Sequence, residues 1–366
     1  MSGVLKYMWA MLYISLLLFG LQFQCYHLSG FHDVQDNHQN TDSTEEWLYP
    51  PFKRECTTNF SALLKIAPYN ANFAFRLYKQ MSSDSDDKNI FFSPVSISTA
   101  FAMLALRAKS QTQTQIYNAF AFNLSEIEEN EIHKGFCQLI FTFNFLKQET
   151  SLKIGNALFI DKSLKVLPTF LKDAKTLYQA ERFSTNFLNS TEAKQQIYSY
   201  MKNKIYGGHL RKVKDFSAHT VMVLVNYMAS KISNWRDEFH SRLTTEGSFL
   251  AYGNTTVKLN FMRKRTMFNH VRDEELSCLV VEVLHSKDAV AWFILPDEGK
   301  LKHVESSLVK EDMNKWRSSF QKEQKYLWIP KFSLSVSYDV KTFLQRLGMT
   351  DVFNRHADLS GFLRIP

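Results

Sequence analysis

The sequence has 366 residues, of which 45% are hydrophobic and 22% charged, and this composition predicts a globular chain with a large core. Its 12 glycines and 8 prolines are too few for a collagen-like or repeat architecture. The formal net charge of +8 is compatible with a polyanionic partner. No run of Arg and Lys is long, so a solvated basic surface without a dedicated partner is the simpler interpretation.

The N-terminal part of the chain predicts export. Residues 1–25 resemble a signal peptide, because Lys6 precedes an apolar stretch at 8–21 that is short for a membrane span. A single-pass anchor is the competing interpretation. Residues 26–67 are polar and lack periodicity, which predicts a flexible extension before a single domain at 68–366. We therefore expect a secreted, extracellular protein with no membrane span after signal cleavage.

The domain is organised around the stretch 89–106, in which residues 90–92 predict a short buried strand and Ser93-Pro94 predicts the start of a core helix. Ser93 offers a hydroxyl that can cap the first turn, and Pro94 suits the first helical position. The residues that follow are apolar nearly all round and are interrupted only by small hydroxyls, which predicts burial on every side. An amphipathic helix at 70–81 precedes it, with apolar side chains four residues apart.

The remaining elements predict an α+β fold, because helices dominate the first half of the chain and strands the second. Further helices are expected at 112–120, 126–147, 168–178, 191–205, 302–321 and 339–347. Strands are expected at 152–160, 219–228, 257–261, 277–284, 289–295 and 326–336.

The four cysteines are far apart and show no CxxC spacing, so no zinc site is expected. If signal cleavage removes Cys25, the three that remain do not predict a disulfide framework. Four Asn-x-Ser/Thr sequons agree with a secretory route and predict N-glycosylation at Asn59, Asn123, Asn189 and Asn254.

The sequence contains no recognisable catalytic constellation. A GxSxG elbow, a phosphate-binding glycine loop and an HExxH motif are all missing, and no nucleophile is paired with a base. We therefore expect a protein that is not an enzyme and needs no metal or cofactor.

Several segments together resemble the serpin family, specifically its secreted clade A (the α1-antitrypsin/kallistatin-like group). They include NANFAFRLYKQM at 70–81, KNIFFSPVSISTAFAMLALRAKSQTQTQI at 88–116 and IPKFSLSVSYDVKTFLQRLGMTDVFNRHADLSG at 329–361. The resemblance implies one domain of three β-sheets and eight or nine helices, with the core helix behind a large central sheet. It also implies suicide inhibition of serine-type endopeptidases, in which a cleaved reactive loop inserts into that sheet.

The resemblance assigns roles to five residues. Asn89, Ser93, Ser96 and Asn226 match the family's "shutter", a buried polar cluster beneath the sliding strands, and Trp235 matches the "breach" where the loop first inserts. Capping and packing remain sufficient structural roles for the same residues.

The chain also departs from the family pattern. The segment 231–235 is one residue longer than usual, and Asn260 stands where a Pro is expected. After Gly361 the sequence continues only with Phe-Leu-Arg-Ile-Pro366, so the reactive loop and the C-terminal strands are absent from it. We expect a chain that is truncated before the reactive-centre loop, contains no reactive site and does not inhibit proteases by itself.

Two kinds of partner are considered besides a serine protease, which would be engaged only by a full-length form. One is a small ligand or hormone, carried as some non-inhibitory relatives do, and the other is a heparin-like polysaccharide. No nucleic acid partner is expected. The polysaccharide could bind at Arg263-Lys264-Arg265, although these residues form no helical face, or at Lys202, Lys204, Arg211, Lys212 and Lys214.

Overall fold

The computed structural model describes residues 56–57, 59–84, 89–146, 152–204, 216, 220–230, 239–250, 255–284, 290–332, 338, 340–354 and 356–362. Within this part of the chain the α-helices are α1 (Ser61–Ser83), α2 (Pro94–Ala105), α3 (Ser110–Ala119), α4 (Glu129–Phe141), α5 (Pro168–Tyr178), α6 (Ser190–Lys204), α7 (Leu301–Ser307), α8 (Lys310–Ser319) and α9 (Lys341–Arg346). The strands are β1 (Leu152–Asp161), β2 (Glu181–Thr185), β3 (Met222–Ser230), β4 (Thr245–Leu250), β5 (Thr256–Asp273), β6 (Cys278–Leu284), β7 (Val290–Pro296) and β8 (Gln321–Pro330).

The described strands form two hydrogen-bonded sheets. The first has the order β2-β1-β3, in which β1 is parallel to β2 and antiparallel to β3. The second has the order β4-β5-β6-β7, and β8 pairs with β5 off this path. Strand β5 is 18 residues long and pairs with β4 near its start and with β6 near its end. Because the continuous strand β5 pairs with both β4 and β6, these strands belong to one sheet. The described strands therefore form two sheets, where three were expected.

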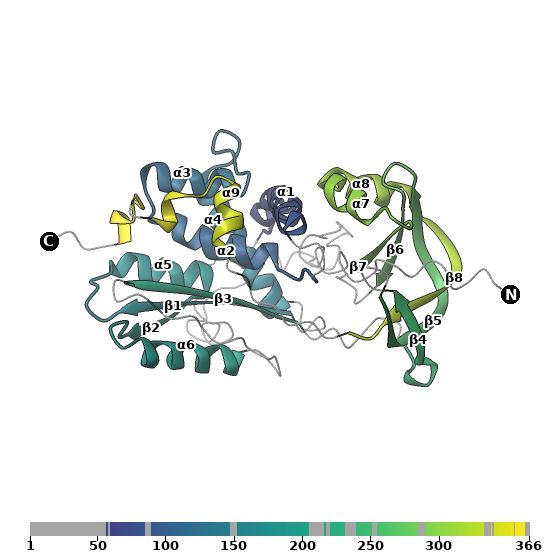
Figure 1. The fold of residues 1–366 in the computed structure, drawn as a ribbon. Coiled ribbons are helices and arrows are strands. Elements are labelled where there is room, and N and C mark those ends of the chain that lie inside the picture. Colours follow the sequence, from purple (N-terminus) through teal and green to yellow (C-terminus); the bar gives the residue numbers. More distant parts are fainter. Residues whose placement is uncertain are drawn as a thin grey trace, which may run out of the picture.

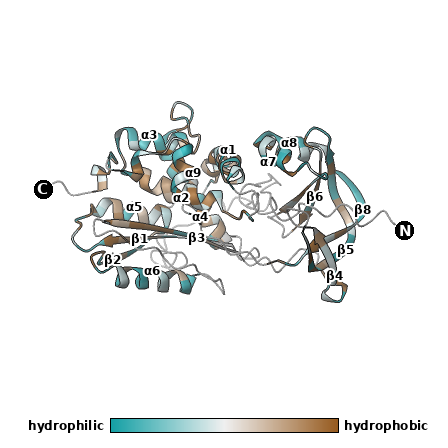
Figure 2. Cartoon of the chain, viewed as in Figure 1, coloured by the Kyte–Doolittle hydropathy of each residue, from teal (hydrophilic) through white to brown (hydrophobic). Residues whose placement is uncertain are grey.

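Helices cover both faces of the first sheet. Figure 1 shows α2, α4 and α5 on one side of β1 and β3, and α6 on the other. The α6 side is sealed by a separate apolar cluster that includes Phe159, Ile197 and Val225. Figure 2 shows β1 and β3 coloured mainly as hydrophobic, as expected for strands buried from two sides. The fold is therefore α+β, as the sequence predicts.

The core helix is confirmed as α2, whereas residues 90–92, which were expected to form a short strand, are not part of one. Ser93 is its N-cap and accepts a hydrogen bond from the backbone N–H of Ser96 at 3.1 Å, while Pro94 occupies the first turn. Every residue of the helix except Ile97 is buried. The all-round apolar pattern thus predicted the correct environment for this helix.

The first helix begins earlier than the sequence predicts, and this corrects the boundary placed at residue 67. The expected helix at 70–81 is the second half of α1, which starts at Ser61 and contains Pro68. Its first turn is held from outside, because the Gln138 side chain accepts from the N–H of Leu63 and donates to the carbonyl of Asn59, both at 2.9 Å. Local sequence periodicity cannot reveal these hydrogen bonds, because the residues that form them are far apart in the chain.

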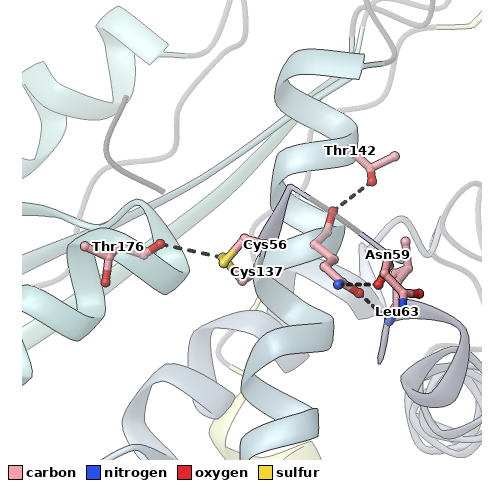
Figure 3. The surroundings of a disulfide bond; sticks show 7 residues. Cys56, Asn59, Leu63, Cys137, Thr142 and Thr176 are labelled. Atoms are coloured by element: carbon pink, nitrogen blue, oxygen red, sulfur yellow. Dashed lines mark hydrogen bonds between the residues drawn. A yellow bond between two sulfur atoms is a disulfide. The ribbon is translucent and has the colours of Figure 1, made fainter. Parts of the chain in front are cut away.

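A disulfide between Cys56 and Cys137 adds to this anchor and corrects the expectation of no disulfide framework. Both cysteines are fully buried, and their Cα atoms are 5.3 Å apart across a sequence separation of 81 residues. Figure 3 shows the bond between Cys56 and Cys137 near Asn59 and Leu63. The side chain of Gln138 on α4 is hydrogen-bonded to the backbone of both Asn59 and Leu63. The segment before α1 is therefore part of the domain as far back as Cys56.

Other differences concern element boundaries. The helix expected at 302–321 is two helices, because Leu308 between them has an extended ψ of 128° and is fully buried. The helix expected at 126–147 is the α-helix α4 followed by a π-helical turn at Thr142–Leu146. The short strand β2 was not predicted. Of the described helices, none has the length and apolar character needed to cross a membrane.

Candidate functional site

A chain of buried and half-buried amides and hydroxyls joins α2 to the first sheet. The hydroxyl of Ser96 donates to the side-chain oxygen of Asn226 on β3. The amide of Asn226 donates to the side-chain oxygen of Asn156 on β1 at 2.8 Å, and the amide of Asn156 donates to the backbone carbonyl of Tyr178 at 2.9 Å. We call Ser96, Asn226, Asn156 and Tyr178 the polar cluster.

The fold places these groups together for simple reasons. Asn156 and Asn226 are direct partners in the antiparallel register of β1 and β3, so their side chains project from the same face. Ser96 lies in the first turn of α2, which packs against that face. Asn156 is 1% exposed and Ser96 is 5% exposed, so an unmade hydrogen bond here would not be replaced by water.

The five residues to which the resemblance assigns roles lie in different surroundings. Ser96 and Asn226 come together in the polar cluster, and Ser93 acts beside them as the cap of α2. Asn89 is exposed and, within the described residues, makes no hydrogen bond to this cluster, and its role in the shutter stays a prediction. Trp235 lies outside the described residues.

Asn156 is the member that sequence reasoning missed. It is a single amide inside the otherwise apolar strand LKIGNALFI, and an amide at such a position needs a partner to be buried. The polar residue in an apolar strand was visible in the sequence. The partner of Asn156 could not be identified, however, until the pairing of β1 with β3 was known.

The polar contacts continue from Tyr178 toward α3 and α4. The hydroxyl of Tyr178 lies 2.6 Å from Nδ1 of His133, whose Nε2 lies 3.2 Å from the hydroxyl of Tyr117 and 3.4 Å from a carboxylate oxygen of Glu129. The same oxygen of Glu129 accepts from the side chain of Gln113 at 2.9 Å. These contacts satisfy polar groups that would otherwise be buried without partners.

Electrostatics agrees with a structural role for this extension. Burial raises the pKa of Tyr178 and of Tyr117, so both phenols stay protonated and can donate. A hydrogen bond from His133 holds the pKa of Glu129 below its ordinary value, despite the opposing effect of burial. The two phenols and the carboxylate of Glu129 therefore act here as hydrogen-bonding groups that hold α3, α4 and α5 together.

A second hydroxyl contact ties α2 to α1. The hydroxyl of Ser98 donates to the side-chain oxygen of Asn70 at 2.5 Å, and both residues are buried. The hydroxyl of Thr99 returns to the carbonyl of Val95 in its own helix at 2.6 Å. The small hydroxyls of α2 are therefore all used to fix the helix against its neighbours or its own backbone.

Only part of the predicted polyanion site can be placed. Lys202 is exposed in the last turn of α6, and Lys204 forms an ion pair with Glu181 at 2.8 Å and lies 5.5 Å from the ring centroid of Tyr200. The hydrogen bond to Glu181 raises the pKa of Lys204. The other three residues of this site, Arg211, Lys212 and Lys214, lie outside the described residues. Of Lys202 and Lys204, the two residues of this site that the structure describes, Lys204 is thus already paired with a carboxylate.

Three of the four predicted glycosylation sites are exposed. The side-chain amide of Asn123 donates to Glu126 at 2.8 Å, and that of Asn189 donates to Glu192 at 3.1 Å. Asn59 is exposed beside the start of α1, with a left-handed φ of 42°. Asn254 lies outside the described residues. Glycosylation of these four positions stays a prediction.

Within the described residues, no group of three or more His, Cys, Asp or Glu side chains is arranged to hold a metal ion. The polar cluster instead bears on how β3, β1 and α2 can separate. Parting β3 from β1, or lifting the pair from α2, must exchange the hydrogen bonds of the polar cluster for others.

Comparison with known proteins agrees with this architecture. The sequence model of the family described as "Serpin (serine protease inhibitor)" matches residues 68–365. The chain is 42% identical over 305 residues to thyroxine-binding globulin of Sus scrofa, covering 83% of this chain and 74% of that protein. It is 41% identical over 328 residues to alpha-1-antiproteinase 2 of Equus caballus, covering 90% of this chain and 75% of that protein.

Solved structures give the same result. Human thyroxine-binding globulin superposes with a TM-score of 0.79 at 42% identity, covering 83% of this chain and 82% of that one. Cleaved kallistatin in complex with heparin gives a TM-score of 0.77 at 39% identity, covering 82% of this chain and 89% of that one. The family match spans more than half of the chain, and these relatives exceed 30% identity, so the chain belongs to the serpin family, in its clade A.

Proposed function

We propose that the protein is a secreted serpin whose first sheet accepts an inserted strand, the step on which inhibition of serine proteases depends in this family. Within the described residues β3 is an edge strand of β2-β1-β3. An edge strand presents unpaired backbone groups to an incoming segment. The polar cluster ties β3 to β1 and α2 beneath this edge, and this arrangement is the observation that carries the proposal.

Strand uptake can be tested without a reactive loop in the chain. Synthetic peptides that copy the small and β-branched residue pattern of serpin reactive loops are incubated with the protein, and the thermal transition is followed. We expect the transition to rise by several degrees, since a ligand that binds only the folded state stabilises it. A scrambled peptide of the same composition is the control, and equal shifts with both peptides would refute strand uptake.

Protease inhibition is tested separately. Residues 1–366 contain no segment that resembles the family's reactive loop, so we expect this chain to form no detergent-stable complex with trypsin-like or chymotrypsin-like proteases. A covalent complex seen on denaturing gels would overturn that expectation.

The alternative function is that of a non-inhibitory binding serpin, and the relatives favour it on specific grounds. One similar structure is thyroxine-binding globulin in complex with thyroxine, and another is kallistatin in complex with heparin. Titration with thyroxine, followed by tryptophan fluorescence, tests the first ligand. Retention on immobilised heparin that is lost with rising salt tests the second, and absence of retention at low salt would exclude it.

A further inference from the structure

Asn59, one of the predicted glycosylation sites, lies in a segment whose backbone is held in place. Its sequon continues with Phe60 and Ser61, which lead into α1, and Asn59 itself has a left-handed φ of 42°. The backbone carbonyl of Asn59 accepts from the side chain of Gln138 at 2.9 Å and from the N–H of Ser61 at 2.8 Å. The ring of Phe60 stacks on that of Phe141, with the centroids 6.4 Å apart. The folded domain therefore fixes the conformation of this sequon.

The long-range contacts at this sequon come from one distant element, α4. Cys56, just before the sequon, is fully buried and bonded to Cys137 of α4, and Figure 3 shows this disulfide near Asn59. Gln138, which holds the carbonyl of Asn59, is the next residue of α4 and lies 79 residues further along the chain. These contacts cannot exist until α4 has been synthesised. The sequon is therefore free at first and becomes fixed only later.

Two other sequons have contacts of a different kind, formed with near neighbours in the sequence. The side-chain oxygen of Asn123 accepts from the N–H of Ser125 at 3.1 Å, and its amide donates to Glu126 at 2.8 Å. The side-chain oxygen of Asn189 accepts from the N–H of Glu192 at 3.2 Å. These partners follow each asparagine so closely that the contacts can form as soon as the segment is made. They do not depend on α4 or on the disulfide.

The chemistry of N-glycosylation requires a sequon that can enter the active site of a transferase. The side-chain nitrogen of the asparagine bonds to the first sugar of a lipid-linked oligosaccharide, the bond from that sugar to the lipid diphosphate breaks, and the amide loses a proton. The enzyme must enclose both the asparagine and the hydroxyl residue of the sequon, so the segment has to leave the protein surface. At Asn59 this would separate the backbone from Gln138 and pull against the disulfide. The folded, disulfide-bonded domain is therefore a poor acceptor at this site.

The order of synthesis limits the time in which Asn59 can react. A ribosome that adds about 5–20 residues per second needs about 4–16 s to pass from Asn59 to Gln138. Disulfide formation then takes seconds or longer. The interval ends when Cys137 has followed Cys56 into the oxidising compartment and has bonded to it. Glycosylation of Asn59 has to be completed within this interval.

We propose that closure of the bond between Cys56 and Cys137 competes with glycosylation of Asn59, so that the protein is secreted in two forms that differ by one glycan. The competition requires the secretion proposed above, on which this inference rests, since both reactions belong to the secretory pathway. A chain that closes the disulfide first keeps Asn59 unmodified. A chain that is glycosylated first can still close the disulfide, because Asn59 is exposed in the folded domain. Both forms therefore reach the same fold.

Replacement of Cys137 tests the competition without changing the sequon. The parent protein and Cys137→Ser are produced in a eukaryotic secretory host, and the glycan occupancy of each sequon is measured by peptide mass spectrometry on intracellular and secreted protein together. Two competing reactions of similar rate give about half occupancy of Asn59 in the parent, and removal of one competitor gives about twofold more. Asn123 and Asn189 are internal standards, and their occupancy should not change.

A matched control separates loss of the disulfide from a general disturbance of folding. Cys278→Ser also replaces a fully buried cysteine but leaves the disulfide in place, so its occupancy at Asn59 should equal that of the parent. Dithiothreitol added to the cells during synthesis should raise the occupancy of Asn59 in the parent and have no further effect in Cys137→Ser. An equal rise in Cys278→Ser and Cys137→Ser would overturn the proposal, because slow folding alone would then explain the result.

The outcomes distinguish failure of the competition from failure of secretion. If Asn123 and Asn189 carry glycans and the occupancy of Asn59 is the same in the parent and in Cys137→Ser, the competition is refuted and secretion still stands. If occupancy rises equally at all three sites, the effect is not specific to the sequon beside the disulfide, and the competition is again refuted. If none of the three sites carries a glycan in either protein, the competition and the proposed secretion both fail.

Discussion

Asn156 of β1 and Asn226 of β3 face each other across the strand pair, with the amide of Asn226 donating to the side-chain oxygen of Asn156 at 2.8 Å. Ser96 of α2 donates to the same side chain of Asn226. Asn226 thus links the helix beneath the sheet to the neighbouring strand, and removing it leaves polar atoms on both sides without partners.

Asn226→Ala should therefore lower the free energy of unfolding by about 2–3 kcal/mol, because two buried groups lose a hydrogen bond and are not rehydrated. Urea denaturation followed by circular dichroism measures the change. Asn203→Ala, at an exposed position of α6, should stay within about 0.5 kcal/mol of the parent. Equal effects of the two substitutions would show that the polar cluster contributes no stability.

Loss of the disulfide should be costly. It closes a loop across 81 residues, and a chain-entropy estimate for such a loop gives about 4.5 kcal/mol of stabilisation. Cys56→Ser/Cys137→Ser should lower the urea midpoint accordingly, and dithiothreitol should then have no further effect on stability. A parent protein that is insensitive to reduction even after prolonged incubation would contradict a stabilising disulfide.

The remaining described cysteine should be inert in the native protein. Cys278 is fully buried, and burial raises the pKa of its thiol to about 12, so almost no thiolate forms near neutrality. Titration with a thiol reagent at pH 8 should detect no reaction of Cys278 in the native state and reaction after denaturation in guanidinium. Rapid native modification at Cys278, located by peptide mass spectrometry, would mean that the core opens readily there.

Ionisation of Asp273 should make the free energy of unfolding depend on pH, and the direction of this effect can be derived from the environment of the carboxylate. Burial opposes its ionisation, but the N–H of Leu276, the indole of Trp316 at 2.6 Å and Lys315 together hold its pKa below the ordinary value. The stabilisation is present above the unfolded-state pKa of about 3.9 and is lost as the pH falls through the lower folded-state value.

Replacing this carboxylate should change the acid limb of the stability curve. Asp273→Asn should destabilise the protein at pH 7 and should also flatten the fall in stability below about pH 4, since one titrating group is removed. Urea denaturation from pH 3 to 7 measures both effects. An acid limb with unchanged slope would show that other carboxylates dominate it.

Gly361 should tolerate no side chain. A Cβ at this position would collide with the backbone carbonyl oxygen of Arg107, which cannot swing away. The neighbouring Phe362 packs on Phe170, with ring centroids 4.5 Å apart, and its carbonyl accepts from the N–H of Leu167 at 2.8 Å. Gly361→Ala should therefore cost about 2–3 kcal/mol, whereas the exposed Ser360→Ala should cost less than about 1 kcal/mol.

Elements with strong local signals were predictable from sequence. Ser93 and Pro94 marked the start of α2, and α5 has the predicted bounds, Pro168–Tyr178. Gly348 follows α9 with φ 96°, the left-handed conformation that favours glycine at the end of a helix. In each case the chemistry that begins or ends the element lies within a few residues of it.

Features that depend on distant partners were not predictable. Strand β2 is short and largely exposed, and it exists because it pairs in parallel with β1. The first turn of α1 depends on Gln138, 75 residues away from Leu63 in the chain. Asn156 needed the register of β1 against β3 before its partner could be named. The site at Arg263-Lys264-Arg265 was judged from sequence by whether the three side chains share a helical face. That criterion does not apply, because these residues lie in strand β5.

The bond between Cys56 and Cys137 also determines how the protein can be prepared. Disulfides form in the secretory pathway and not in the reducing cytosol of a bacterial host. Protein made in such a host would lack the covalent link that holds the segment before α1 against α4. Its thermal transition and its N-terminal protease sensitivity would describe a different molecule, so export-competent expression is required for the parent protein and for every variant that keeps both cysteines.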